Sequence, residues 1–366
     1  MKILLVITKA EIGGAQAFVL TLAKGLKARG QEVAVAAGAG DYLSNALQEA
    51  GIRFIRLKSL KRSGNPFSTL TSANELRQLI RREGFSVLHL NSSNALSGAL
   101  AAKMSGRQVK TVFTVHGLSV LDENYQTAAP IKASFKKYFR FFLRFVDEVV
   151  CVSEHNLAAV RRSGLTNKGG VIYNGLNLPP TYFWNRSRAR EELQRLCKSK
   201  LKDDDFLIGS IGRLAYQKNY EFLIRSWKQI KALKPQAKLL IIGAGPEEEK
   251  YQRLIKEGGL TDEIYLPGLR AEASELLQGF DLFVLPSIYE GLSISLIETI
   301  FSGVPALASD VGGNREVIGA DNCYPLDDEE EFLKKLMQAP AYPAAASITK
   351  FSAQEMVEKY LRVYEI

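Results

Sequence analysis

Residues 281–318 form the stretch that most restricts how this chain can fold. An apolar run ending at Pro286 is followed by a helical pattern of apolar residues, a Gly-Val-Pro turn, a second apolar run and a Gly-Gly loop. The order strand, helix, strand is a βαβ unit, and such a unit requires its two strands to be parallel. The stretch therefore predicts an α/β fold built on a parallel sheet.

The loops of this stretch indicate a binding site. Residues 287–291 and 309–314 each leave the carboxyl end of a predicted strand and enter a helix, and such crevices bind nucleotides and phosphates. Two carboxylates belong to the unit, Glu290 in the first loop and Glu298 in an otherwise apolar helix. A carboxylate in such a helix needs a partner, and Glu298 could accept two hydrogen bonds from a ribose diol. Glu290 could hold a sugar hydroxyl or balance charge.

Strands and helices alternate through the rest of the 366-residue chain, which is too long for one small core. We therefore predict two tandem Rossmann-like domains, each a doubly wound parallel sheet. The expected division is 1–174 for the first domain, 175–186 for a hinge, 187–345 for the second domain and 346–366 for a C-terminal helix that packs back toward the first. Strands are predicted at 2–8, 32–37, 54–57, 87–90, 111–115, 148–152, 206–211, 238–242 and 264–266.

Cysteine content and charge indicate the redox environment of the protein and the class of partner that it binds. Three cysteines without C-x-x-C spacing indicate neither a zinc site nor a disulfide framework, and they fit a reducing cytosol. Residues 1–180 hold 24 basic against 11 acidic residues, whereas residues 181–366 hold 24 against 28. The basic first half predicts an anionic partner such as a membrane surface or a phosphorylated acceptor. No signature of a nucleic-acid-binding fold is present, so we expect no nucleic acid partner.

Two cations follow the first predicted strand of the second half. Arg213 comes directly after Gly212 at the end of that strand, and Lys218 is five residues further on. Arginine can bind phosphate oxygens through paired hydrogen bonds, while lysine adds a compact positive charge. We expect a pyrophosphate as their partner, and two solvated loop cations are the alternative.

Glycines stand at the same kind of position in both halves. Gly13 and Gly14 lie at the first turn from strand to helix, and Gly243 ends a strand in the second half. Glycine lets the backbone approach a phosphate or an acceptor closely, although turn formation alone would explain the pair at 13–14 equally well.

Residues 131–146 combine cations with six aromatic residues. Four of the cations recur every four residues, which places them along one stripe of a helix. A basic, aromatic amphipathic helix suits the headgroup layer of an anionic membrane, and a core helix with solvated cations is the alternative. Residues 53–62 add a second basic cluster. The expected membrane contacts are Lys132, Lys136, Lys137, Arg140 and Arg144.

The motifs occur in an order that resembles the retaining GT-B glycosyltransferases of family 4. No single piece is decisive, but the ordered set is specific and spans nearly the whole chain. The resemblance implies the GT-B fold, in which two Rossmann-like domains are separated by an interdomain cleft. The matching pieces are Gly13-Gly14-Ala15, Val115-His116-Gly117, Cys151-Val152-Ser153, Ile172-Tyr173-Asn174-Gly175, Gly212-Arg213 with Lys218-Asn219, Gly243-Ala244-Gly245-Pro246, Glu290-x7-Glu298, Gly303-Val304-Pro305 and Gly312-Gly313.

The resemblance also implies roles for single residues. The donor would be a nucleotide-diphosphate sugar, with a UDP-sugar favoured over a GDP-sugar and no further cofactor. Arg213 and Lys218 would bind the diphosphate and Glu298 the ribose, while Glu290 and the Leu292-Ser293 loop would face the sugar. His116 would lie near the reaction centre. The implied catalytic residues are His116, Arg213, Lys218 and Glu290, and the implied donor-binding residues are Gly13, Gly14, Gly212, Arg213, Lys218, Gly243, Leu292, Ser293 and Glu298.

Members of this family transfer sugar with retention and without an essential metal. The Asp203-Asp204-Asp205 run matches the D-x-D pattern of metal-dependent enzymes, but it precedes a strand, so we interpret it as a solvated turn and expect no metal site. No carboxylate can be assigned as the nucleophile of a double displacement. We therefore expect same-face attack, in which the departing phosphate helps to take the acceptor proton.

The expected activity is transfer of a hexose to a glycan or lipid-linked acceptor in bacterial cell-surface polysaccharide or glycolipid synthesis. The expected location is the cytoplasm, at the inner face of the cell membrane. A sugar-nucleotide epimerase and a soluble small-molecule glycosyltransferase are alternatives among enzymes. A catalytically silent membrane-associated partner subunit is the alternative from another class.

Overall fold

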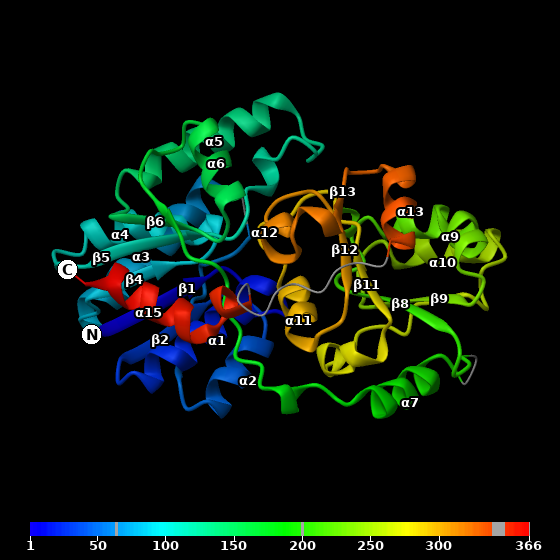
Figure 1. Ribbon diagram of the computed structural model, residues 1–366. Helices are drawn as coiled ribbons and strands as arrows, with labels where there is room; N and C mark the ends of the chain where they lie inside the picture. Colours follow the sequence, from blue (N-terminus) through cyan, green and yellow to red (C-terminus); the bar gives the residue numbers. More distant parts are fainter. Residues whose placement is uncertain (63–64, 199–200, 339–347, 366) are drawn as a thin grey trace. The chain divides into compact units, whose positions relative to one another are not determined.

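The computed structural model describes residues 1–62, 65–198, 201–338 and 348–365 (Figure 1). The chain divides into two compact units, of which the first contains Met1–Asn177 and Thr349–Ile366 and the second Leu178–Ile348. The C-terminal residues thus belong to the same unit as the N-terminal half. Residues 339–347, where the sequence placed the end of the second domain and the start of the last segment, lie outside the described residues.

The first unit is built on a seven-stranded sheet with the order β3-β2-β1-β4-β5-β6-β7, in which every pairing is parallel. The strand order reverses between β1 and β4, as it does in doubly wound sheets. The strands are β1 (Lys2–Ile7), β2 (Glu32–Ala37), β3 (Arg53–Arg56), β4 (Val87–Leu90), β5 (Lys110–Val115), β6 (Glu148–Cys151) and β7 (Gly170–Val171), and the helices are α1 (Gly14–Ala28), α2 (Tyr42–Glu49), α3 (Pro66–Glu83), α4 (Gly98–Lys103), α5 (Ala129–Leu143), α6 (Glu154–Arg162) and α15 (Ala353–Tyr364).

Helices cover both faces of this sheet because its strands are apolar on both sides. Along β1, Leu4 and Val6 join one buried cluster, whereas Ile3, Leu5 and Ile7 join the other. The first cluster contains residues of α3, α4, α5 and α6, and the second contains residues of α1, α2 and α15. The near-continuous apolar strands seen in the sequence are therefore explained by burial on two faces.

The second unit repeats the plan with six parallel strands in the order β10-β9-β8-β11-β12-β13. The reversal of strand order falls between β8 and β11. The predicted pair of Rossmann-like, parallel-sheet domains is therefore confirmed. The strands are β8 (Phe206–Ile211), β9 (Ala237–Ile242), β10 (Ile264–Tyr265), β11 (Leu282–Leu285), β12 (Ala306–Ser309) and β13 (Cys323–Tyr324), and the helices are α7 (Arg186–Leu196), α8 (Tyr220–Arg225), α9 (Trp227–Leu233), α10 (Glu248–Glu257), α11 (Ile294–Ser302), α12 (Asn314–Ile318) and α13 (Glu329–Met337).

The last helix, α15, packs against α1 in the first unit (Figure 1). The Ser352 hydroxyl accepts a hydrogen bond from the Glu355 N–H at 3.2 Å and so caps the start of the helix. A Cβ placed on Gly25 of α1 would lie 2.3 Å from a methyl carbon of Val357. The two helices therefore approach closely because position 25 carries no side chain.

This close approach gives the first prediction. Gly25→Ala should lower the free energy of unfolding by about 1–3 kcal/mol, because the added methyl group overpacks the interface by more than the helix gains from alanine. Urea denaturation of the full chain measures the change. In a Val357→Ala background the same substitution should cost less, because the clashing methyl groups are gone. Equal costs in both backgrounds would show that the contact does not limit the packing.

Buried hydrogen bonds tie α15 to the sheet as well. The His89 ring on β4 bonds the Tyr364 hydroxyl at 2.6 Å and the Thr114 hydroxyl at 2.7 Å, and Thr114 also bonds the Tyr360 hydroxyl at 2.8 Å. Burial lowers the pKa of His89 well below its ordinary value, so the ring is neutral. The network joins residues far apart in the chain and gives His89 a structural role.

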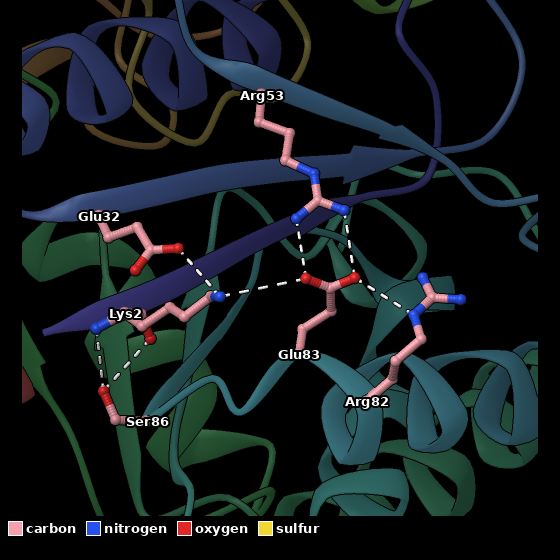
Figure 2. A network of polar contacts seen from close by, with 6 residues as sticks. All are labelled: Lys2, Glu32, Arg53, Arg82, Glu83 and Ser86. Atoms are coloured by element: carbon pink, nitrogen blue, oxygen red, sulfur yellow. Dashed lines mark hydrogen bonds and ion pairs between the residues drawn. The ribbon is translucent and has the colours of Figure 1, made fainter.

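Ion pairs connect side chains at the amino-terminal edge of the same sheet (Figure 2). The Arg53 guanidinium donates two hydrogen bonds to the Glu83 carboxylate, at 2.8 and 3.1 Å, and Arg82 donates a third at 3.2 Å. Hydrogen bonding to Arg53 lowers the pKa of Glu83 to about 2. Lys2 bridges Glu32 and Glu83 across the strands. Arg53 is thus engaged inside the unit.

Among the helices that the structure describes, none is both long enough and apolar enough to cross a membrane.

Candidate active site

The clearest site lies in the second unit, where the strand order reverses between β8 and β11. Parallel strands share one carboxyl edge, and ligands bind at that edge where the order reverses. Gly212 and Arg213 follow β8, and the loop at 287–291 follows β11. The sequence located both loops at strand ends. Only the strand order shows that they are neighbours.

An ion pair joins the two loops. The Lys218 ammonium lies 2.7 Å from a Glu290 carboxylate oxygen, and both side chains are largely buried. The Ser287 hydroxyl donates to the same oxygen at 2.7 Å, and Gln217 donates to the Tyr289 carbonyl at 2.9 Å. An ammonium group has three N–H donors, so Lys218 can hold Glu290 and a ligand together. The pairing fixes both charges at the edge of the sheet.

Arg213 supplies a positive charge that nothing in the described chain neutralises. Its side chain is exposed and makes no hydrogen bond or ion pair with the described residues. Since Glu290 offsets Lys218, the guanidinium of Arg213 gives these two loops a net positive charge. Such an arrangement favours an anionic ligand, and a guanidinium matches phosphate oxygens in particular.

Glycines allow the loops at this edge to pack backbone against backbone. Gly312 has a φ of +55°, and a Cβ there would lie 2.2 Å from the Glu290 carbonyl oxygen. Its neighbour Gly313 donates a hydrogen bond to the Gly291 carbonyl at 2.9 Å. A Cβ on Gly243 would lie 1.9 Å from the Gly212 carbonyl oxygen. The loops after four neighbouring strands are thereby held together, and no larger residue fits these positions.

The helix after β11 carries the second carboxylate. Ser293 caps α11, its hydroxyl accepting from the Leu296 N–H at 3.4 Å, and Leu292 is buried before it. Glu298 lies in α11, partly buried, and its carboxylate has no hydrogen bond or ion pair within the described residues. Desolvation raises the pKa of Glu298 to about 7. A partly buried, unpaired carboxylate is an acceptor of hydrogen bonds that an incoming ligand can supply.

His116 lies in the first unit, directly after β5. Its ring contacts the Phe18 ring edge to face, with 4.6 Å between centroids. Burial lowers the pKa of His116 to about 3, so the imidazole is neutral in the folded protein. The residue stands at the carboxyl edge of the first sheet, as the sequence predicts for it.

The neighbouring Asn91 determines which ring nitrogen of His116 carries the proton. The Asn91 amide donates to the His89 carbonyl at 3.1 Å, which turns its own carbonyl oxygen toward His116 Nε2 at 3.3 Å. An amide oxygen only accepts hydrogen bonds, so Nε2 must be the donor. Nδ1 then keeps its lone pair and can accept a hydrogen bond from a hydroxyl group.

Gly13 and Gly14 lie in the first unit too, at the start of α1 after β1. Both are exposed, and no side chain caps the helix there. At the same edge the Thr8 hydroxyl bonds the Ser92 hydroxyl at 2.6 Å, which joins the ends of β1 and β4 where the strand order reverses. The glycines and His116 therefore share one edge of one sheet. The residues predicted for the donor diphosphate and ribose share an edge of the other sheet.

The D-x-D run lies where the sequence placed it. Asp203 and Asp204 accept hydrogen bonds from Gln194 and Gln236, and Asp205 accepts from the Lys202 N–H at 2.7 Å just before β8. Its carboxylates thus stabilise a turn at the amino-terminal edge. Within the described residues, no three His, Cys, Asp or Glu side chains gather closely enough to hold a metal ion.

The basic aromatic helix α5 begins and ends earlier than the predicted range of 131–146. Phe139 and Phe142 are buried in the core, and Tyr138 donates to the Ser93 carbonyl at 3.0 Å. Two of the predicted cations also bind inside the unit, since Lys132 donates to the Asp122 carbonyl at 2.8 Å and Arg140 to that of Gly164 at 2.7 Å. Lys137 and Arg144 are exposed, and Lys136 is partly exposed.

Three residues of these sites were missed from the sequence. Ser287 and Gln217 hold Glu290 and its loop, and Asn91 orients His116. Asn91 directly follows β4, Ser287 lies two residues after β11, and Gln217 precedes a predicted cation, so the sequence contains a signal for each of them. The partners of Gln217 and Asn91 could not be predicted, because they lie in loops that follow other strands and only the sheet order brings those loops together. Ser287 bonds Glu290 within its own loop.

Comparison with known proteins matches both halves of the chain to family models. Residues 12–179 match Glycosyltransferase Family 4, and residues 194–350 match Glycosyl transferases group 1. The N,N'-diacetylbacillosaminyl-diphospho-undecaprenol alpha-1,3-N-acetylgalactosaminyltransferase of Campylobacter jejuni is 25% identical over 366 residues, which cover 95% of this chain and 94% of that protein. The N-acetyl-alpha-D-glucosaminyl L-malate synthase of Bacillus anthracis is 25% identical over 311 residues, covering 81% and 73%.

The fold has solved counterparts. The crystal structure of HepE from Anabaena in complex with UDP and glucose superposes with a TM-score of 0.81 and 19% identity, covering 99% of this chain and 98% of that one. At this identity the likeness concerns the fold.

Proposed function

The chain belongs to the GT-B glycosyltransferases of family 4, and from this premise we propose that it transfers a hexose from a nucleotide-diphosphate sugar to a lipid-linked acceptor, with retention at the anomeric carbon. The donor is a UDP-sugar, no metal or other cofactor takes part, and the product enters a bacterial cell-surface polysaccharide or glycolipid. The enzyme works in the cytoplasm, at the inner face of the cell membrane.

One observation carries this proposal. At the point where the strand order of the second unit reverses, the buried pair of Lys218 and Glu290 stands in loops joined to each other, and Arg213 in the first of these loops has no partner among the described residues. These groups offer fixed positive charge to a diphosphate, which gains negative charge as it leaves the sugar. Glu298 accepts hydrogen bonds from the ribose, and Glu290 with the Leu292-Ser293 loop faces the sugar.

In the proposed reaction the acceptor hydroxyl attacks the anomeric carbon on the face that the diphosphate leaves. The bond from the acceptor oxygen to the anomeric carbon forms, the bond from that carbon to the phosphate oxygen breaks, and the acceptor proton passes to the departing phosphate. Arg213 and Lys218 stabilise the leaving group. The free Nδ1 lone pair of His116 accepts a hydrogen bond from a sugar hydroxyl, and Gly13 and Gly14 let the substrate approach the backbone.

The relatives support a lipid-linked acceptor but leave a second candidate. The Campylobacter relative is named for a diphospho-undecaprenol acceptor, whereas the Bacillus relative is named for L-malate. A soluble small-molecule glycosyltransferase is therefore the second candidate. The basic first half of the chain favours the lipid-linked acceptor, because such an acceptor carries a diphosphate and lies at an anionic membrane. A sugar-nucleotide epimerase or a silent partner subunit would use fewer of the charged groups described above than a glycosyltransferase with a lipid-linked acceptor.

Nucleotide binding and donor turnover test the proposal. We expect UDP to raise the melting temperature of the full chain more than GDP or ADP at equal concentration, because a ligand that binds only the folded state stabilises it, by about 2.7 kcal/mol at one hundred times its Kd. We also expect slow hydrolysis of a UDP-hexose, which phosphate-release assays detect. A chain that binds no nucleotide and hydrolyses no donor would contradict the proposal. A trapped covalent glycosyl-enzyme would contradict the same-face mechanism alone.

A further inference from the structure

We propose that the first unit docks on an anionic lipid bilayer through the start of α3 and through the loop residues 57–62 that follow β3. This α3 surface is defined by Phe67 and Leu70 on the helix and by Lys58, Lys61 and Arg62 in the loop. The inference rests on the proposed function in one respect, namely that a lipid-linked acceptor has to be reached at a membrane. It assigns the contact to cations of the second basic cluster, at 53–62, together with Phe67 and Leu70, which the sequence did not single out as membrane-binding.

Among the large apolar residues that the structure describes in the first unit, the two on this surface are the most exposed. Phe67 is 77% exposed and Leu70 is 63% exposed, and residues three apart on a helix are neighbours on its surface. On α5, Ile131 is 55% and Phe141 is 47% exposed, but ten residues separate them, which is about 15 Å along a helix. Phe67 and Leu70 therefore form one apolar contact, whereas the exposed apolar residues of α5 stand singly.

The basic loop is held against the same helix. Leu57 and Leu60 are buried, which anchors the loop in the core. The Glu75 carboxylate of α3 accepts hydrogen bonds from the N–H groups of Lys58 and Ser59, both at 3.0 Å. These contacts bind the loop to the body of α3, while Lys58, Lys61 and Arg62 stay exposed. The apolar pair and the cations thus belong to one scaffold of the kind found at membrane interfaces.

Charge favours an anionic partner for this surface. Residues 53–83 contain eight basic residues and two acidic ones, Glu75 and Glu83. Both acidic groups are already engaged, Glu75 by the loop and Glu83 by Arg53 and Arg82 (Figure 2).

The cations of the 53–62 cluster differ in whether they bind groups inside the unit. Arg53 and Arg56 bind inside the unit, the latter to the Asp41 carboxylate at 2.7 Å. Lys58, Lys61 and Arg62 are exposed, and none has an ion pair with a residue that the structure describes. These three cations are available to lipid headgroups, each of which contributes attraction near an anionic surface.

The α3 surface lies at the same edge of the first sheet as His116. Its loop leaves the carboxyl end of β3, and His116 leaves the carboxyl end of β5, so both lie on the same edge. Four strand spacings separate β3 from β5, or about 19 Å. A bilayer at the α3 surface would present acceptors along the edge that carries His116. Substitutions on the α3 surface should leave the donor chemistry of the second unit unchanged.

Vesicle binding of the full chain tests the inference. Wild type should float with phosphatidylcholine vesicles that contain phosphatidylglycerol and not with phosphatidylcholine alone, and added salt should weaken the binding. Replacing the three loop cations together, Lys58→Gln, Lys61→Gln and Arg62→Gln, should lower partitioning about 100-fold. Phe67→Ser with Leu70→Ser should lower it at least about tenfold, because the apolar contact is lost.

The matched control is α5, which the sequence predicted as the membrane helix. Ile131→Ser with Phe141→Ser, and Lys137→Gln with Arg144→Gln, remove the same residue types from exposed positions and should leave binding unchanged. All these side chains are exposed, so melting curves should match wild type. Loss of binding in the α5 variants with binding retained in the α3 variants would overturn the inference. So would wild-type protein that binds neither vesicle type or both equally, the result expected if a protein partner covers the surface.

A spectroscopic probe makes the test independent of bulk affinity. Phe67→Trp should give tryptophan emission that shifts to the blue with anionic vesicles and is quenched by brominated lipid, whereas Phe141→Trp should not change. UDP-hexose hydrolysis in solution separates the two proposals. If hydrolysis persists while no vesicle binding occurs, the docking surface fails and the glycosyltransferase proposal stands. If the protein binds vesicles but hydrolyses no UDP-hexose, the docking surface stands and the glycosyltransferase proposal fails.

Discussion

Lys218→Met should lower kcat/KM for donor hydrolysis and transfer by about 10²–10³-fold, the cost typical of removing one charged group that stabilises a leaving group. The substitution keeps the length of the side chain and removes its ammonium. Because Glu290 is largely buried and pairs with Lys218 at 2.7 Å, the variant should also lose about 3 kcal/mol of stability. Steady-state kinetics and urea denaturation measure the two effects.

A double variant separates catalysis from folding. Lys218→Met with Glu290→Gln removes both charges, so the buried carboxylate is no longer left without a partner and most of the stability should return. Activity should not return, because the ammonium group that stabilises the departing diphosphate is still missing and the carboxylate that faces the sugar is now replaced as well. Lys228→Met, at an exposed position of α9 in the same unit, is the control and should match wild type. Recovery of activity in the double variant would show that Lys218 acts only through the fold.

Glu298→Gln should stabilise the free protein at pH 8 and weaken its binding of nucleotide. The pKa of Glu298 is raised to about 7 by desolvation, above the value of about 4.5 expected in the unfolded chain, so the folded state favours the protonated form. The stability that this group contributes is present below about pH 4.5 and is lost as pH rises to about 7. At pH 8 the ionised carboxylate therefore lowers the free energy of unfolding by about 2–3 kcal/mol. Glutamine cannot ionise, so the variant avoids this loss.

Nucleotide binding should show the opposite dependence on pH. Ribose hydroxyls donate hydrogen bonds, and the ionised carboxylate accepts them best, so wild-type affinity for UDP should rise through about pH 7 and level off above it. The variant should bind about 10- to 100-fold more weakly at pH 8, with no such rise. Calorimetry at several pH values measures both. A wild-type affinity independent of pH, or a variant less stable than wild type at pH 8, would remove Glu298 from the ribose site.

The comparison with the variant isolates this one group. Burial lowers the pKa values of His89 and His116, so both rings oppose folding as pH falls below their ordinary value of 6.5. That loss is the same in wild type and in Glu298→Gln. The difference between the two proteins therefore reports the carboxylate alone.

Local chain chemistry was enough to predict the class of fold. Apolar runs ending at glycine or proline predicted the strands, and alternation with helical patterns predicted parallel sheets. The strands at 32–37, 87–90 and 206–211 match the structure residue for residue. The cap at Ser352 is likewise local, since capping depends on residues within one turn. Such features need no knowledge of distant contacts.

The partners that individual charged side chains bind could not be predicted from local chain chemistry. The basic stripe on residues 131–146 and the cluster at 53–62 look alike in sequence, yet Lys132, Arg140, Arg53 and Arg56 all bind groups inside the unit. A cation binds a carbonyl or carboxylate that folding brings near it, and the residues involved are far apart along the chain. Periodicity indicates a helix but not which of its faces is covered.

By itself, the sequence determined that this protein has two parallel α/β sheets and that its glycines, cations and carboxylates lie at strand ends, because strand and turn formation depend on neighbouring residues. Only the tertiary structure decided which of these residues meet. It paired Lys218 with Glu290, left Glu298 without a partner among the described residues, and turned Asn91 toward His116. The physical reason is strand order: loops distant in sequence become neighbours when their strands pair, and a charge is then neutralised or left desolvated.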